Sequence, residues 1–135
     1  LGNLAGNSEN EVKIAAEGGI AVVIDAMKRH KDDGALQECG CAALRNVALN
    51  SENQVKIAAE GGIAVIIDAM RRHKDNGALQ ERGCGALLNI GWSSLECRIL
   101  IKSAGGTEAV TRAMNAAGAT AECRSCGQQL IDRLK

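Results

Sequence analysis

The sequence predicts an all-α fold, a right-handed superhelix (α-solenoid) built from repeated units of three helices. Residues 7–49 and 50–92 are identical at 33 of 43 positions, which indicates stacked repeats. Within each unit, apolar residues recur at helical spacing, and paired glycines separate the helical segments. The 135 residues contain no Pro, Phe or Tyr and one Trp, so small aliphatic side chains must fill the core where helices approach closely.

The repeat divides one predicted domain into units. A third, diverged unit spans residues 93–135 at an offset of 44, so that Met114 matches Met70. One residue inserted near Ser93 explains the change of offset. Residues 1–6 match the end of a unit, and they are therefore expected to be the tail of a preceding repeat. Because the chain does not begin with Met, we expect it to be a fragment or a trimmed version of a longer protein.

Each unit is expected to begin with a short helix, at residues 10–17 in the first unit. Ser8 with Glu11, and Ser51 with Gln54, match the capping box that starts a helix. The Gly-Gly pair that follows is a natural helix stop.

The second helix is expected to begin near Ile20. It carries one apolar stripe at positions i, i+3, i+4 and i+7, formed by Ile20, Val23, Ile24 and Met27. The cations of its last turn suit the negative end of the helix dipole. The third helix is expected at residues 35–49. Glycine recurs inside it, at Gly40, Gly83 and Gly127, at a cost of about 1 kcal/mol each relative to Ala. Close helix contact explains this recurrence, and so does drift from a duplicated ancestor.

Charge and composition exclude several function classes. Lys plus Arg and Asp plus Glu each number 16, and this balance argues against nucleic-acid binding. The longest apolar runs are as short as residues 63–67, so no membrane span is expected. No signal peptide is visible, so the six Cys are expected to be reduced thiols in the cytoplasm, the nucleus or both.

Signals for chemistry are weak. Cys123 and Cys126 form a C-x-x-C motif, but no second pair supplies a zinc site, and core thiols are expected. The basic segments 28–31 and 71–74 fit solvated helix ends, with phosphate contacts as the alternative. No nucleophile, base and acid converge in any local pattern, so no enzyme, metal or cofactor is expected.

Two segments carry a family resemblance. NQVKIAAEGGI (residues 53–63) and GCAALRNVA (residues 40–48) resemble the first-helix and third-helix signatures of the armadillo repeat. The order of short helix, Gly-Gly bend, amphipathic helix and long helix is also similar, and the resemblance covers essentially the whole chain. HEAT repeats lack this three-helix unit. Where the family often has Pro near the start of the second helix, this chain has Ala21 and Ala64.

The resemblance implies a groove lined by successive third helices that binds an extended peptide. Armadillo proteins often clasp the peptide backbone with a ladder of Asn side chains, because an amide both donates and accepts hydrogen bonds. Asn3, Asn46 and Asn89 occupy the matching positions, and Arg133 ends the ladder in the third unit. The implied function is a non-enzymatic module that binds a protein or peptide partner.

The ten differences between the twin units also favour a binding face. Six lie in the third helix, and four of these follow a spacing near i+3. These four substituted pairs are Cys39/Arg82, Ala42/Gly85, Arg45/Leu88 and Leu49/Trp92. We interpret them as variation of the groove lining on a fixed scaffold, with neutral drift as the alternative.

Other residues of this face leave alternatives open. Importin-like members carry Trp where this chain has Ala42 and Gly85, so a receptor for nuclear localisation signals is not expected. Glu38 and Glu81 would make the groove acidic, or are simply solvated. Trp92 would be a binding anchor or would pack at the junction with the last unit.

Self-association is the alternative function. The leading stub of six residues is too short to cap the next unit, so Val12 and Ile14 are expected to be exposed, and uncapped repeat ends tend to pair. A designed array is a third possibility, although the diverged last unit and the six Cys argue against it.

Overall fold

The computed structural model describes residues 18–135, and this part of the chain is all-helical, with no strand. None of the helices in this range is both long and apolar enough to cross a membrane. The helices are α2 (Ile20–Arg29), α3 (Gly34–Val47), α4 (Ser51–Ala59), α5 (Gly62–Arg72), α6 (Gly77–Ile90), α7 (Leu95–Ser103), α8 (Gly106–Asn115) and α9 (Ala121–Leu134).

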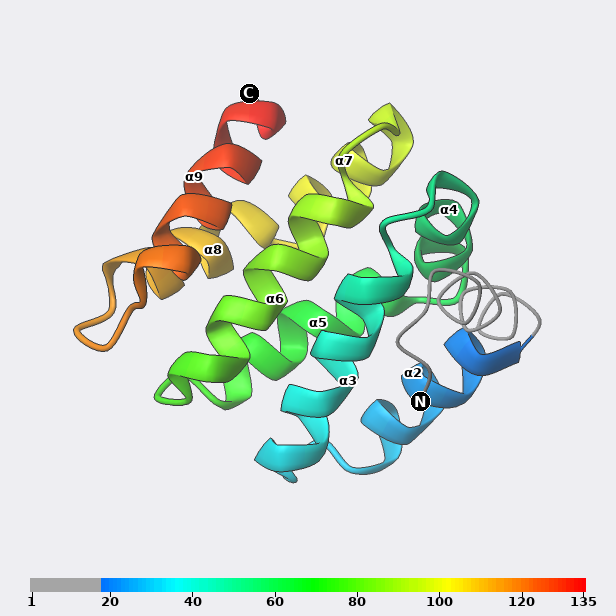
Figure 1. Cartoon of the computed structure of the whole chain (residues 1–135), viewed down its shortest axis with the longest axis horizontal. Helices are drawn as coiled ribbons and strands as arrows, with labels where there is room; N and C mark the ends of the chain where they lie inside the picture. Colours follow the sequence, from blue (N-terminus) through cyan, green and yellow to red (C-terminus); the bar gives the residue numbers. More distant parts are fainter. Residues whose placement is uncertain (1–17) are drawn as a thin grey trace, which may run out of the picture.

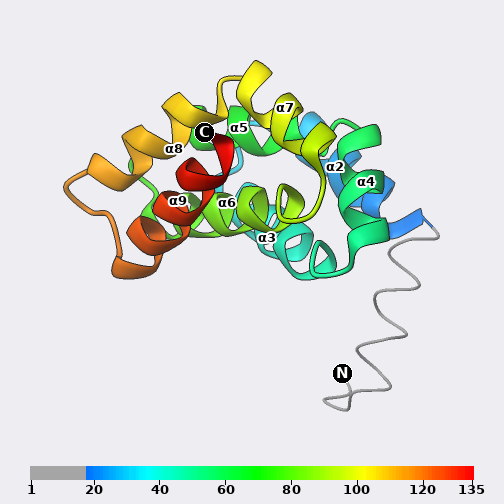
Figure 2. The ribbon, with the colours of Figure 1, turned by 90° about the horizontal axis from the view of Figure 1, so that it is seen from above.

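The helices form two layers and an edge (Figures 1 and 2). The long helices α3, α6 and α9 lie side by side in one layer, and α6 packs between the other two. Helices α2, α5 and α8 form the second layer behind them, while the short helices α4 and α7 stand along one edge. Each equivalent helix of successive units therefore occupies an equivalent place in the array.

The start of each long helix is set by a side-chain cap. Asp33, Asn76 and Thr120 each accept a hydrogen bond from the backbone N–H three residues later, at 3.1, 3.0 and 3.0 Å. Such a cap satisfies one of the free N–H groups of the first turn. The first of these helices was expected at 35–49; it begins one residue earlier and ends at Val47.

The capping-box prediction for α4 is wrong by one residue. The cap is Asn50, whose Oδ1 accepts from the N–H groups of Glu52 and Asn53 at 2.9 and 3.3 Å. Gln54 does not reach back to the helix start. It is buried and donates through Nε2 to the carbonyl of Ala48 at 2.9 Å, which ties α4 to the end of α3. The predicted cap at Ser8 and Glu11 and the predicted helix at 10–17 lie outside the described residues.

The Gly-Gly stop is confirmed between α4 and α5. Gly61 has φ of 87°, and its equivalent Gly105 has φ of 86°, a left-handed conformation that favours glycine. Each is the N-cap residue of the helix that follows.

The recurring glycine of the long helices marks close contact between helices, as one of the two explanations predicted. A Cβ on Gly40 would lie 2.5 Å from Sδ of Met27, and one on Gly83 would lie 2.7 Å from Sδ of Met70. Gly127 meets Met114 in the same way, at 2.6 Å from Sδ. Because the Met of each second helix fills the space of a missing methyl group, the glycine lets the two layers approach.

Two buried glutamines join the layers by hydrogen bonds. Nε2 of Gln37 donates to the carbonyls of Met27 and His30, at 3.0 and 2.7 Å. Gln80 repeats this arrangement one unit later, at 3.0 and 2.8 Å from the equivalent carbonyls. Carbonyls at a helix C-terminus have no partner within the helix, so one amide of the next helix satisfies the end of α2 and another the end of α5.

Candidate functional site

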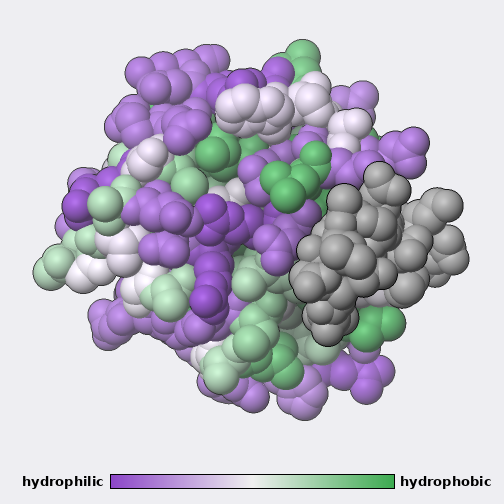
Figure 3. Space-filling model, viewed as in Figure 1, coloured by the Kyte–Doolittle hydropathy of each residue, from purple (hydrophilic) through white to green (hydrophobic). Residues whose placement is uncertain are grey.

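The outer surface of α3, α6 and α9, called here the third-helix face, holds the predicted site residues of the described part of the chain. Figure 3 views this face and shows hydrophilic side chains running across its middle, with apolar side chains between them. The polar groups come from all three helices, and most of them contact a neighbouring unit.

Of the described Asn side chains in the predicted ladder, one is exposed and the other already forms a hydrogen bond within the protein. Asn46 is exposed on α3. Asn89 is half-buried, and its Nδ2 donates to the carbonyl of Arg45 at 2.9 Å, so this amide group already holds two units together. Arg133, which takes the equivalent place on α9, is exposed. Asn3 lies outside the described residues.

The two glutamates of the face are neither simply solvated nor free. Glu38 on α3 pairs with Arg82 on α6 at 2.6 Å and also accepts from Asn76 at 3.4 Å. Glu81 on α6 accepts a hydrogen bond from Oγ1 of Thr120, the cap residue of α9, at 2.6 Å. Both carboxylates therefore bridge successive units and give the face less free negative charge than the sequence predicted.

Arg45 connects the first long helix with the last. Its Nη2 lies 2.7 Å from Oε2 of Glu122 on α9, so the side chain crosses α6. It passes over Gly85, where a Cβ would lie 2.6 Å from Nε of the guanidinium. This contact explains two differences between the twin units, at Arg45/Leu88 and Ala42/Gly85, by packing within the protein, because the glycine makes room for the arginine.

We expect Arg45 and Glu122 to be weakly coupled in stability. Their side chains are 28% and 50% exposed, so solvent screening limits the interaction to about 0.5 kcal/mol. A double-mutant cycle with R45A and E122A, followed by urea unfolding, measures this coupling. In a G85A background the new methyl group displaces the guanidinium, and the coupling should vanish. A coupling that persists in G85A would contradict this path across α6.

The apolar positions of the face divide into covered and open ones. Leu88 is buried and Ala42 is half-buried. Leu49 is 75% exposed and Trp92 is 47% exposed, at equivalent positions just beyond the ends of α3 and α6. One side of the indole is covered, because the guanidinium of Arg133 stacks 3.5 Å from the ring centroid and its Nη1 donates to the Trp92 carbonyl at 3.0 Å. The expected packing of Trp92 at the junction with the last unit is therefore confirmed for one side of the ring, and its role as a binding anchor stays a prediction.

The six thiols differ in environment. Cys39, on the third-helix face, is exposed, and the other five are buried, including Cys123 and Cys126 as expected for core thiols. Burial raises the pKa of the Cys41 thiol to about 12, although the positive charge of Arg82 acts in the opposite direction. Burial also raises the pKa of Cys126. In residues 18–135, no group of three or more His, Cys, Asp or Glu side chains is placed to hold a metal ion.

We expect one thiol in six to react with Ellman's reagent in the native chain. Cys39 is exposed, whereas the buried thiols are shielded and Cys41 stays protonated near neutral pH. Absorbance of the released thiolate should therefore report one equivalent before denaturation and six afterwards. The C39S variant should lower the native value to near zero. Rapid reaction of a second thiol in C39S would contradict this.

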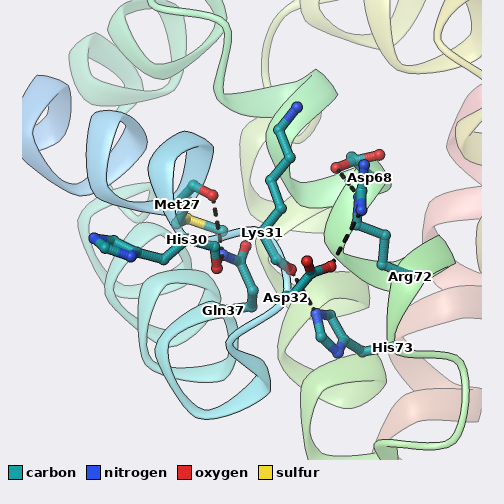
Figure 4. A network of polar contacts seen from close by, with 8 residues as sticks. All are labelled: Met27, His30, Lys31, Asp32, Gln37, Asp68, Arg72 and His73. Atoms are coloured by element: carbon teal, nitrogen blue, oxygen red, sulfur yellow. Dashed lines mark hydrogen bonds and ion pairs between the residues drawn. The ribbon is translucent and has the colours of Figure 1, made fainter.

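The basic segments at the ends of α2 and α5 form contacts between units (Figure 4). Nε2 of His73 lies 2.7 Å from the carbonyl oxygen of Lys31. Arg72 pairs with Asp68 on its own helix at 2.9 Å and with Asp32 of the preceding unit at 3.3 Å. The acidic neighbours thus take up part of the positive charge, which favours structural helix ends over a phosphate site.

A surface hollow of about 390 Å³ lies beside these contacts, between α2 and α5. Lys28 and Lys31 line it together with Asp68, and buried Gln37 forms part of its wall. Charges of both signs line this hollow, so the lining selects no single class of ligand.

Sequence reasoning missed the partners that the structure brings to the face. Glu122, Thr120 and Asn76 lie 77, 39 and 38 residues from the side chains that they contact. Two of these pairs are separated by nearly one repeat length, which the sequence does show, but the sequence does not show which long side chain turns toward the next unit.

Comparison with protein-family models, with curated proteins and with solved structures gave no match.

Proposed function

We propose that the chain is an armadillo-type repeat module, coiled as a right-handed superhelix, that binds an extended segment of a partner protein along the third-helix face. The side-by-side placement of equivalent helices in each unit supports this architecture. The role is non-enzymatic and intracellular, needs no cofactor, and does not involve nucleic acid.

One observation carries the proposal. Leu49 and Trp92 occupy equivalent positions one unit apart, and both remain exposed in a fold that buries most of its large apolar side chains. Exposed apolar groups in register on a rigid scaffold are typical of surfaces that bind other proteins. They also differ between the twin units, so that each offers a different contact to a partner side chain.

Asn46 supplies the polar half of the proposed contact. Its exposed amide can donate to a carbonyl and accept from an N–H of an extended backbone. At Asn89 the Nδ2 group is already bonded to Arg45, which leaves the carbonyl oxygen of that amide as the group offered to a partner. The proposed partner therefore gains its backbone hydrogen bonds mainly beside α3, and its apolar side chains lie on Leu49 and Trp92.

A phage-displayed library of random peptides tests the proposal. We expect selected peptides to carry apolar residues and to lose affinity roughly 30-fold for W92A, as for a hot-spot aromatic residue, and less for L49A and N46A. Fluorescence anisotropy with labelled peptides measures these losses. V22A is the matched control, because Val22 is 68% exposed but lies on α2. Binding that is unchanged in all three face variants, or no selected peptide, would count against the proposal.

Self-association is the second candidate, favoured by a comparison of equivalent residues. Val65 on α5 is 9% exposed because the first unit packs on it, whereas its equivalent Val22 is 68% exposed. Val12 and Ile14 lie outside the described residues. Light scattering over a concentration series tests this candidate: a dimer that V22D dissociates supports it, and a monomer at all concentrations rejects it.

A further inference from the structure

We infer that Cys84 and Cys123 form a redox site at the contact between α6 and α9, at which a peroxide converts the two thiols into one disulfide. This inference is independent of the peptide-binding proposal. The site lies in the layer of long helices but beneath the surface, so neither residue belongs to the third-helix face.

The geometry of the two sulfur atoms carries the inference. The Sγ atoms lie 3.8 Å apart, and both side chains are 0% exposed. A disulfide needs a separation near 2.05 Å, so the atoms must approach by roughly 1.8 Å. Cys123 lies in the first turn of α9, where its N–H donates to the cap residue Thr120, and the loop of residues 116–119 precedes that cap, so the required shift involves the loop and the start of the helix.

The remaining thiols are placed differently. Cys97 on α7 uses its sulfur to contact the carbonyl of Gln54 at 3.9 Å. Cys39 is exposed on α3, Cys41 is buried on the same helix, and Cys126 lies one turn further along α9. Among the cysteines, only Cys84 and Cys123 have sulfur atoms within hydrogen-bonding distance of each other.

The contact between the two thiols also indicates which of them attacks the peroxide and which of them then forms the disulfide. The hydrogen bond with Cys123 raises the pKa of Cys84, and burial adds to this effect. The same hydrogen bond lowers the pKa of Cys123, because the S–H of Cys84 stabilises a thiolate there, and the positive charge of Arg124 adds to this effect, while burial and the Glu81 carboxylate act in the opposite direction. The N-terminal end of α9 further favours negative charge at this position. Cys123 is thus the nucleophile and Cys84 the resolving thiol.

The reaction balances with hydrogen peroxide as the oxidant. The Cys123 thiolate attacks one peroxide oxygen, the O–O bond breaks, and hydroxide leaves with a sulfenic acid at Cys123. Sγ of Cys84 then attacks Sγ of Cys123, and the S–O bond breaks as the disulfide forms. Two electrons pass from the sulfurs to the peroxide, and both thiol protons end in water, so that two water molecules are produced.

Burial gives the site a selectivity that an exposed thiol lacks. Hydrogen peroxide is small and uncharged and can reach the pair through brief local opening, whereas bulky thiol reagents are excluded. Because Cys84 is already in contact, it captures the sulfenic acid before further oxidation. The resulting bond closes a loop of the chain between α6 and α9 and links the last two units covalently.

The test uses the full chain with C39S, which removes the exposed thiol and with it disulfides between molecules. The native protein is treated with hydrogen peroxide, blocked with N-ethylmaleimide and examined by intact mass and peptide mapping. Before blocking, we expect a product two hydrogens lighter than the reduced chain, and after blocking, we expect the peptide map to show Cys84 joined to Cys123. Cleavage after Glu96 separates Cys84 from Cys97, and cleavage after Arg124 separates Cys123 from Cys126, so together they make the assignment unambiguous.

Variants and controls distinguish this pair from general oxidation. C84S should reduce the yield of the internal disulfide roughly tenfold or more, whereas C97S, which removes another buried thiol, should leave it unchanged. The peptide map of the C39S chain identifies the bonded cysteines without either variant, so the test remains valid even if C84S folds poorly. No disulfide at peroxide concentrations that oxidise Cys39 in the parent chain, or a bond from Cys84 to Cys126 instead, would overturn the inference.

Discussion

Replacing Gly106 by Ala is expected to destabilise the chain by about 3 kcal/mol and to lower Tm by roughly 10 °C. A Cβ at this position would lie 2.7 Å from the carbonyl oxygen of Ile101 and would also overlap the Ile101 side chain. The obstacle is backbone in the last turn of α7, so it cannot move aside as a flexible side chain would. Thermal unfolding followed by circular dichroism measures the loss.

Gly118→Ala is the matched control for this prediction. Nothing lies within 4 Å of a Cβ there, and the residue is exposed between α8 and α9. The same chemical change should therefore leave Tm within a few degrees of the parent value, with a small gain available from reduced freedom of the unfolded chain. Equal Tm values for the two variants would contradict the close approach at Gly106.

Truncating Leu87 to Ala is expected to cost between about 2 and 5 kcal/mol of unfolding free energy. Leu87 is 0% exposed on α6, the helix that packs between α3 and α9, so the cavity cannot collapse from a free surface. Urea unfolding should show a lower midpoint, and the slope with denaturant should stay the same if the native fold is retained.

Leu49→Ala removes the same atoms from an exposed position and is the control for Leu87. Its side chain is 75% exposed, so stability should change by no more than about 0.5 kcal/mol. This variant also separates stability from function, because the peptide-binding proposal requires it to fold normally and to bind more weakly. A large loss of stability in L49A would show that the residue is part of the core.

Local patterns predicted the elements well where the physical cause is local. The apolar stripe of Ile20, Ile24 and Met27 predicted α2, and all three side chains are buried. The Gly-Gly stop depends on backbone freedom at a single residue, and the φ of 87° at Gly61 bears this out. The start of α4 was misplaced at Ser51 because neighbouring Asn and Ser are both good caps, and their relative strength depends on the preceding turn.

The candidate site was less predictable, because its contacts join residues far apart in the chain. The Asn ladder was placed by register alone, and the sequence could not show that the Asn89 amide turns toward Arg45. Nor could it show that Glu38 and Glu81 bridge units, since a Glu on a helix surface is most often solvated. The exposed Leu49 and Trp92 stay proposed partner contacts that only binding measurements test.

What the sequence by itself determined is the helical fold and the Gly-Gly stop between α4 and α5, because these follow from periodicity and from backbone sterics within one unit. Only the tertiary structure decided which polar side chains are engaged and which are open. Arg45 reaches Glu122 because three long helices lie side by side and Gly85 leaves space between them. A side chain as long as that of arginine can point to several neighbours, and packing of distant units selects one.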